Sequence, residues 1–351
     1  MAPMTTEASE EDGTVSVEEL AYLQRRARGG VSAVITSCTY VDNAGKAFRG
    51  IGAASDTHID SLISVAATIH AGDARAILQL YDAGRLAPGS PRAPSAIASS
   101  RPSAPVPREM SDVEIERLID AFGEAAMRAV RAGFDGIELH GANHYMLHQF
   151  FSPRANRRKD HWGGSLEARM TFPSAVVDAV RQAIGEHRVL GYRVTPYEIE
   201  AEGGITLDDT IALAKRLDDL RIDYLHLSLD NYASAAPLRE DRKMDVPIVA
   251  RPEEHPLPAI VRAVPDLPVV AVGGVWSLAD AERMLSDGAS AVAVARAIVV
   301  NPEWPKLIRK NAAIRLALPN SRERIARELD VPPRMVDYIL GRPGFFPVEE
   351  A

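Results

Sequence analysis

The sequence predicts an α/β fold in which parallel strands alternate with helices. Short runs rich in β-branched residues alternate with amphipathic helical stretches along almost the whole chain, which is the pattern of strands joined by crossover helices. The strand-like runs are nearly continuous in apolar residues, as expected of strands that are buried on both faces. The length of 351 residues allows either two average domains or one large barrel.

Seven stretches have the composition of buried strands. They are residues 32–40, 74–80, 134–140, 189–195, 224–228, 269–272 and 291–295. Eight β/α units would close a (β/α)8 TIM barrel, and an eighth strand could lie only at the start of the chain, in residues 1–4. We therefore predict a TIM barrel whose first strand is apparently truncated. An open doubly wound sheet is the alternative, but no Gly-x-Gly-x-x-Gly follows a predicted strand, and residues 50–55, the nearest approach, lack the third glycine.

The predicted barrel forms one domain. Ser16 and Ser111 each begin a helix, and both are followed three residues later by Glu, which fits a capping box. Residues 86–108 are dense in Pro, Ser and Ala and are expected to form an excursion after the strand at 74–80, near the active site. We expect the barrel domain to span residues 1–329 and residues 330–351 to form a C-terminal extension.

Composition excludes several classes of protein. One cysteine forms no internal disulfide and supports no four-cysteine zinc or iron–sulfur site. The net charge is −8 without a long basic run, so a nucleic-acid partner is not expected. The acidic N-terminus does not resemble a signal peptide, and no apolar stretch approaches the roughly 20 residues that span a bilayer. We expect a cytoplasmic enzyme that binds neither nucleic acid nor membrane and that forms, as one option, a homo-oligomer.

Glycine and arginine at two late strand ends predict a phosphate site. The strand at 269–272 is followed by Gly273 and Gly274, and the strand at 291–295 ends at Ala295 before Arg296. Glycines let backbone N–H groups approach an anion, and Arg adds a charge-assisted contact. Loops after the seventh and eighth strands are the usual phosphate cradle of this barrel. The alternative is that these glycines only turn the chain.

A second group of polar residues follows the strand at 134–140. His140 and Asn143 can both donate hydrogen bonds to one carbonyl oxygen and so stabilise an enolate-like transition state. A hydroxyl nearby, that of Tyr145, could deliver a proton. Polar residues after a strand also cap turns, so this trio alone is weak support for catalysis.

A metal site is the competing hypothesis for the same segment. His140, His144 and His148 are spaced by four residues and would line up as ligands on one helix. However, the residues before His140 have strand character, so the three side chains should not share a helical face. We expect no metal among the site residues.

One long motif resembles a known family. It comprises residues 133–143 (GFDGIELHGAN), Tyr145, residues 149–153 (QFFSP), residues 156–160 (NRRKD) and residues 163–167 (GGSLE). This motif is similar to that of the Old Yellow Enzyme family of FMN-dependent NAD(P)H oxidoreductases. Residues 2–5, residues 79–85, Arg193 and the regions of Gly274 and Arg296 resemble further blocks of the family in the same order.

The resemblance implies a set of cofactor-binding residues. They are Pro3, Met4, Thr5, Gln79, Arg193, Gly273, Gly274, Ala295 and Arg296. Gln79 would contact the pyrimidine end of the FMN ring, and the fixed charge of Arg193 would stabilise the anionic reduced flavin there. His140 and Asn143 would bind the substrate carbonyl oxygen, and Tyr145 matches the proton donor of the family.

The implied reaction is ene reduction. NADH or NADPH would reduce FMN, and the activated C=C of an α,β-unsaturated carbonyl compound (an enone or enoate) would then take the hydride. The alternatives are a metal-dependent barrel lyase or hydrolase and a truncated, catalytically impaired relative. Two departures from the family pattern stand out: the residues that normally precede the Ala-Pro-Met block are missing, and His144 replaces a frequent glycine.

Overall fold

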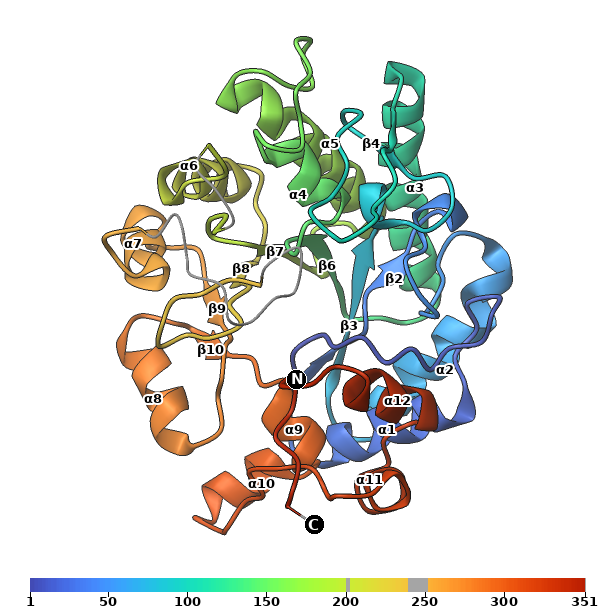
Figure 1. Cartoon of the computed structure of the whole chain (residues 1–351), viewed down its shortest axis with the longest axis vertical. Coiled ribbons are helices and arrows are strands. Elements are labelled where there is room, and N and C mark those ends of the chain that lie inside the picture. The colour runs from blue at the N-terminus through green and yellow to red at the C-terminus, as the bar shows by residue number, and fades with distance from the viewer. Residues whose placement is uncertain (200–202, 239–251, 351) are drawn as a thin grey trace.

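The strands form one curled parallel sheet with helices around its outside (Figure 1). The computed structural model describes residues 1–199, 203–238 and 252–350. The strands are β1 (Ala33–Ile35), β2 (Thr39–Tyr40), β3 (Arg75–Tyr81), β6 (Gly136–Gly141), β7 (Val189–Val194), β8 (Tyr224–Leu227), β9 (Val269–Ala271) and β10 (Ala291–Val292). Their order is β1-β3-β6-β7-β8-β9-β10, with β2 also paired to β3. This is the (β/α)8 barrel that the sequence predicts, although the predicted strand at 32–40 is split into β1 and β2.

Met1 and Ala2 bridge the two ends of the curled sheet. The Met1 amine donates to Ala33 O at 2.7 Å, and Ile35 N donates to Met1 O at 3.2 Å. On the other side, Ala2 N donates to Val294 O at 2.9 Å. The gap expected from a truncated first strand is therefore crossed by two residues, which link β1 to the segment after β10.

The helices cover the outside of the barrel, as crossover helices must. They are α1 (Val17–Arg28), α2 (Ile59–His70), α3 (Asp112–Arg131), α4 (Met146–Phe151), α5 (Leu166–Ile184), α6 (Leu207–Asp219), α7 (Pro256–Ala263), α8 (Leu278–Ser286), α9 (Arg296–Val300), α10 (Trp304–Arg309), α11 (Arg322–Leu329) and α12 (Pro333–Leu340). Within the described residues, no helix is both long and apolar enough to cross a bilayer.

The two predicted capping boxes have different outcomes. At α3, Ser111 and Glu114 make both reciprocal contacts of the box. At α1, Ser16 Oγ accepts from Glu19 N at 3.1 Å, but the predicted return contact is wrong. The buried Glu19 carboxylate instead accepts hydrogen bonds from the hydroxyls of Thr6 and Ser9, both at 2.6 Å. Two hydroxyl donors satisfy this carboxylate better than the single N–H of its own helix cap, and they fix the N-terminal segment on α1.

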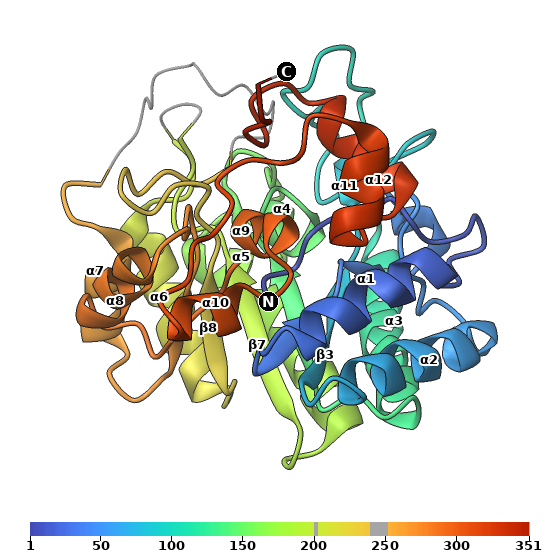
Figure 2. The ribbon, with the colours of Figure 1, turned by 90° about the horizontal axis from the view of Figure 1, so that it is seen from below.

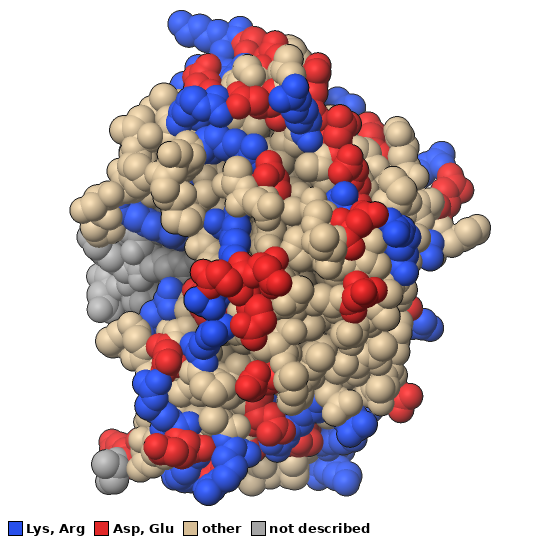
Figure 3. Space-filling view, turned by 90° about the vertical axis from the view of Figure 1, so that its right-hand side faces the viewer, with Lys and Arg blue, Asp and Glu red and all other residues tan. Residues whose placement is uncertain are grey.

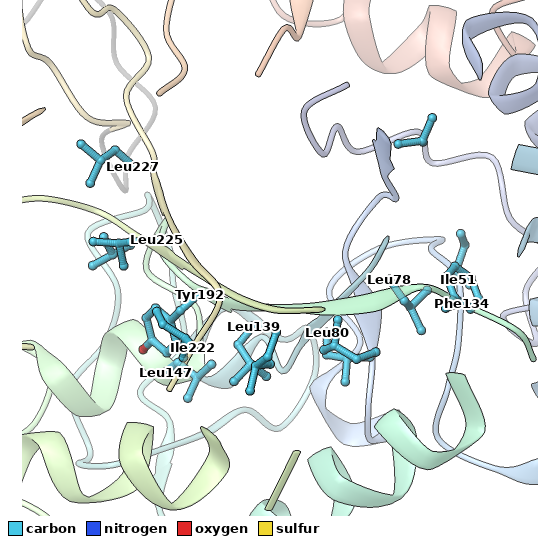
Figure 4. Close-up of a cluster of buried hydrophobic side chains, with 14 of the residues drawn as sticks. Ile51, Leu78, Leu80, Phe134, Leu139, Leu147, Tyr192, Ile222, Leu225 and Leu227 are labelled. Atoms are coloured by element: carbon cyan, nitrogen blue, oxygen red, sulfur yellow. The ribbon is translucent and has the colours of Figure 1, made fainter. Parts of the chain in front are cut away.

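Alternation along the strands separates the core from the site. Figure 4 shows Leu78 and Leu80 of β3 within a cluster that also contains Leu139, Tyr192 and Leu225. Successive strand residues point to opposite faces. The strand residues that alternate with these apolar residues therefore point into the barrel, where their polar side chains are available to a ligand.

The excursion and the C-terminal segment both fold back onto the barrel. Residues 86–108 contain most of a small parallel pair, β4 (Arg92–Ala93) with β5 (Arg108–Glu109). Figure 2 shows α11 and α12 above α1, beside the N-terminal segment, and Arg334 donates to Ser9 O at 3.1 Å. On the face drawn in Figure 3, basic and acidic side chains are interspersed. The domain boundary at residue 329 stays a prediction.

Candidate active site

An open cavity lies at the carboxyl end of the barrel. All twelve residues that the sequence analysis assigned to the site line this cavity. They are Pro3, Met4, Thr5, Gln79, His140, Asn143, Tyr145, Arg193, Gly273, Gly274, Ala295 and Arg296. Ligand sites of such barrels lie at this end because the strand ends and their loops converge there.

The register of the parallel strands places polar residues of neighbouring strands side by side in the interior of the barrel. Gln79 of β3 lies opposite Glu138 of β6. His140 of β6 lies opposite Arg193 of β7, which in turn lies opposite His226 of β8. Parallel pairing therefore brings side chains from four consecutive strands into one buried polar cluster beneath the cavity.

Glu138 is the centre of this cluster. Its carboxylate accepts hydrogen bonds from Gln79 Nε2 at 2.6 Å, from Tyr224 OH at 2.9 Å and from His226 Nδ1 at 2.9 Å. Burial raises the pKa of Glu138, but the His226 contact and the Arg193 charge outweigh it, so the pKa lies below its ordinary value. Burial lowers the pKa of His226, and its Nδ1 is the donor in this pair because a carboxylate oxygen accepts. Sequence reasoning missed this cluster, although a glutamate within an apolar strand was a usable signal.

Two buried side-chain nitrogen atoms in the wall of the cavity can form hydrogen bonds with a ligand. Arg193 Nε and His140 Nδ1 have no hydrogen-bond partner among the described residues, and both side chains line the cavity. Burial, with the Arg193 charge second, holds the pKa of His140 well below its ordinary value of 6.5. A cation beside a neutral imidazole suits a ligand that is rich in acceptor atoms, because buried polar groups need partners.

The loop after β6 presents Asn143 and Tyr145 to the cavity. Asn143 has a φ of 56°, and its N–H donates to Thr195 Oγ1 at 2.9 Å. The hydroxyl of Ser228 donates to Asn143 Oδ1 at 2.9 Å, so the amide NH2 of Asn143 is directed elsewhere as a donor. The Tyr145 ring lies 5.0 Å from the His140 ring, at an angle of 66°. Ser228 was not predicted, and its position depends on β8 lying beside β7.

The two glycines at the opposite end of the cavity have different surroundings, and only Gly274 faces open space. Gly273 has a φ of 133°, and an added Cβ would lie 2.7 Å from Tyr232 N, so a side chain is excluded there. Gly274 has a φ of 70°, and an added Cβ would meet no atom within 4 Å. Arg296 Nη2 donates to Asp230 O at 3.1 Å at the same end of the cavity. Open backbone beside an arginine fits the predicted phosphate group.

Several lining residues were not predicted. Tyr338 and Phe345 reach the cavity from the C-terminal extension, and Trp276 and Asp230 reach it from loops. Cys38 is buried, as expected of a small core residue, but it also lines the cavity. The aromatic residues carry no motif, so only the docking of the extension reveals them.

The proposed histidine triad does not form. His140 lies on β6, whereas His148 lies on α4 and His144 lies in the loop between these elements. Among the described residues, His144 and His148 group with Glu198 instead, and ligand atoms of these three residues lie within 4.8 Å of one another. The strand character of residues 134–140 explains why His140 is not part of this group.

A parallel barrel with a cavity for an anionic, acceptor-rich ligand is typical of cofactor-dependent enzymes. The chain belongs to the NADH:flavin oxidoreductase / NADH oxidase family, whose family model matches residues 1–314. The predicted membership of the Old Yellow Enzyme family is confirmed, and with it FMN as cofactor and NAD(P)H as hydride donor. A metal-dependent lyase or hydrolase is not favoured.

Relatives of known name agree with this membership. NADH:fumarate oxidoreductase of Klebsiella pneumoniae is 39% identical over 343 residues, which are 95% of this chain but 36% of that protein. The chain thus spans about a third of the length of this relative. The probable NADH-dependent flavin oxidoreductase YqiG of Bacillus subtilis is 38% identical and matches 88% of this chain and 83% of its own. The solved structure of the Old Yellow Enzyme homologue from Zymomonas mobilis has a TM-score of 0.76 and 26% identity, covering 90% of this chain and 89% of its own.

Proposed function

We propose that this flavin oxidoreductase reduces the activated C=C bond of α,β-unsaturated carbonyl compounds. The observation that carries the proposal is that carbonyl-binding, proton-donating and cofactor-binding candidates from distant parts of the chain line one cavity. A relative acts on fumarate, according to its name, and fumarate is an alkene activated by carboxyl groups. Because the chain spans only part of that relative, the substrate class is inferred from the residues of the cavity.

His140 and Asn143 bind and polarise the substrate carbonyl. The low pKa of His140 keeps its imidazole neutral near pH 7, so the ring carries one N–H to donate. Ser228 fixes the Asn143 amide with its NH2 as the second donor. Two donors aimed at one oxygen stabilise the charge that develops there during hydride addition.

Tyr145 supplies the proton that completes the reduction. Its ring packs against the His140 ring at 5.0 Å and against the Tyr81 ring at 5.0 Å, in both cases edge to face. These contacts fix the phenol next to the carbonyl-binding pair. A phenol held in this way can act as a general acid toward the substrate carbon that is not attacked by hydride.

The remaining lining residues fit FMN. When bound, FMN takes a hydride from NAD(P)H and gives it to the alkene. Gln79 and Arg193 would contact the polar end of its ring, with Arg193 Nε available as a buried donor. Gly274 and Arg296 would bind its phosphate, and Pro3, Met4 and Thr5 would line the ring. A cytoplasmic location and a homo-oligomeric state stay predictions.

Separate measurement of the two half-reactions tests this function. The purified chain is mixed anaerobically with NADH or NADPH and then with 2-cyclohexenone, while the flavin absorption is followed. We expect the flavin bands to bleach with the nicotinamide and to return with the enone. Flavin that is reduced but not reoxidised by any enone or enoate would contradict the proposed substrate class. A chain that binds no flavin would support the catalytically impaired alternative.

A further inference from the structure

We propose that His144, His148 and Glu198 form a binding site for a divalent zinc-type cation. The three side chains are buried, and their ligand atoms lie within 4.8 Å of one another. None of the three lines the cavity described above. The site therefore lies outside the cavity and includes one residue of the loop at 142–145, between β6 and α4, which we call the substrate loop.

The distances within the group suit a tetrahedral metal ion. His148 Nε2 lies 3.3 Å from Glu198 Oε1, and His144 Nδ1 lies 3.8 Å from the same oxygen. Ligands at zinc bond lengths of about 2.0–2.1 Å in tetrahedral geometry are separated by about 3.4 Å. Two imidazoles and one carboxylate are also a donor set that zinc sites use, with one coordination position left open.

Hydrogen bonds outside the group orient two of the three ligands. Glu198 Oε2 accepts from Ser152 Oγ at 2.7 Å and from Ile205 N at 2.9 Å, so Oε1 is the oxygen directed at the imidazoles. The carbonyl of Leu238 can only accept, so His144 Nε2, at 3.2 Å, must carry the proton. Ligating histidines generally donate their second N–H in this way, and ligating carboxylates are held by similar contacts.

With its Nε2 proton directed at Leu238 O, His144 has Nδ1 on the side of Glu198 Oε1, which is the arrangement that a ligating imidazole needs. His144 has a φ of 64°, a left-handed conformation that histidine adopts more often than most residues with a side chain.

The consequence of metal binding is control of the substrate loop. His144 lies between Asn143 and Tyr145, while Glu198 belongs to the segment after β7. An ion bound by these residues would join the two segments and fix both residues that face the substrate. The ligands act through position, so we class them as positioning residues.

Zinc binding by the purified, tag-free chain tests this proposal. After chelation, ZnCl2 is titrated by equilibrium dialysis with metal analysis, and thermal unfolding is measured with and without zinc. Variants H144G and E198Q each remove one ligand, S152A removes an orienting contact, and H70Q is the control. His70 pairs with Asp135 at 2.7 Å without a second imidazole.

We expect the wild type and H70Q to bind one zinc per chain and to unfold at a higher temperature when zinc is present. H144G and E198Q should lose at least about 100-fold in affinity, and S152A about 10–100-fold. H144G puts glycine at a positive φ, so its fold should be retained even if E198Q misfolds. The proposal is overturned if the wild type binds no stoichiometric zinc, or if H144G binds it as tightly as the wild type.

Discussion

Glu138 and Glu198 are both buried glutamates with histidine neighbours, but they organise opposite sides of the site. Glu138 lies on a strand beneath the cavity, and its two oxygens accept from Gln79, Tyr224 and His226. Glu198 lies under the substrate loop, with one oxygen held by protein donors and the other directed at two imidazoles.

The different surroundings of Glu138 and Glu198 indicate different roles for the two sides of the site. The strand side, around Glu138, is a network whose acceptors are satisfied by the protein itself, and it places Arg193 and Gln79 in the wall of the cavity, where we propose that the cofactor binds. The loop side, around Glu198, includes Asn143 and His144, both at positive φ, directly before Tyr145, and it is where we propose that a cation binds. We therefore expect strand-side changes to affect stability and cofactor binding, and loop-side changes to affect reduction of the alkene.

Replacement of Tyr145 by Phe gives the largest expected effect and tests the loop side. Loss of a general acid typically slows a reaction about 10²–10⁴-fold. We expect a loss of this size in reoxidation of the flavin by an enone, with reduction by NAD(P)H largely unchanged, in stopped-flow absorbance. Tyr338→Phe, at another tyrosine of the cavity wall, should change neither rate. Equal losses in both half-reactions of Tyr145→Phe would contradict its role as proton donor.

Replacement of Glu138 by Ala tests the strand side. The change leaves the buried Arg193 charge without its neighbouring carboxylate and removes the acceptor of three donors. Breaking such a buried cluster typically destabilises a protein by about 3–5 kcal/mol, which urea unfolding would measure. Glu116→Ala, at an exposed glutamate of α3, should stay within about 0.5 kcal/mol of the wild type. Equal stability of the two variants would mean that the Glu138 cluster does not support the barrel.

Replacement of Arg296 by Ala tests the phosphate end of the cavity. A hydrogen bond to a charged group contributes about 1.5–3 kcal/mol, which corresponds to roughly 10–150-fold in the FMN dissociation constant. Flavin fluorescence during titration of the apoprotein measures this constant. Arg296→Lys keeps the charge and should lose less. An FMN affinity that is unchanged in both variants would remove Arg296 from the phosphate site.

The pH dependence of stability gives the smallest expected effect. Burial lowers the pKa of both His140 and His226, so the unfolded chain binds a proton before the folded chain does. Stability contributed by these groups is therefore present above about pH 6.5 and falls as the pH drops, by up to about 1.4 kcal/mol per pH unit for each histidine. His140→Gln should show a shallower decline than the wild type in urea unfolding at pH 5.5–7. An identical decline would mean that His140 titrates normally in the folded chain.

The strand side could be predicted from the sequence to a large extent. Gln79, His140 and Arg193 end apolar runs, and the ends of parallel strands must meet at one edge of the barrel. The bounds of β3, β6, β7, β8 and β9 were predicted to within two residues, because buried strands have a dense apolar signal, whereas the predicted strand at 291–295 extends three residues beyond β10. The split between β1 and β2 was not predicted, because a bend in the chain leaves no signal in the amino-acid composition.

The loop side and the outer wall of the cavity could not be predicted in the same way. Glu198 meets His144 and His148 only because the segment after β7 folds under the substrate loop. Tyr338 and Phe345 reach the cavity only through docking of the C-terminal extension. The half-formed cap at Glu19 has the same origin, since Thr6 and Ser9 compete for its carboxylate across a tertiary contact.

The most direct test of the central claim is a crystal structure of the flavin-loaded chain. We predict one FMN at the carboxyl end of the barrel, with its ring against Gln79 and Arg193 and its phosphate at Gly274 and Arg296. Electron density for the flavin in another cavity, or with its phosphate beside Gln79, would contradict it.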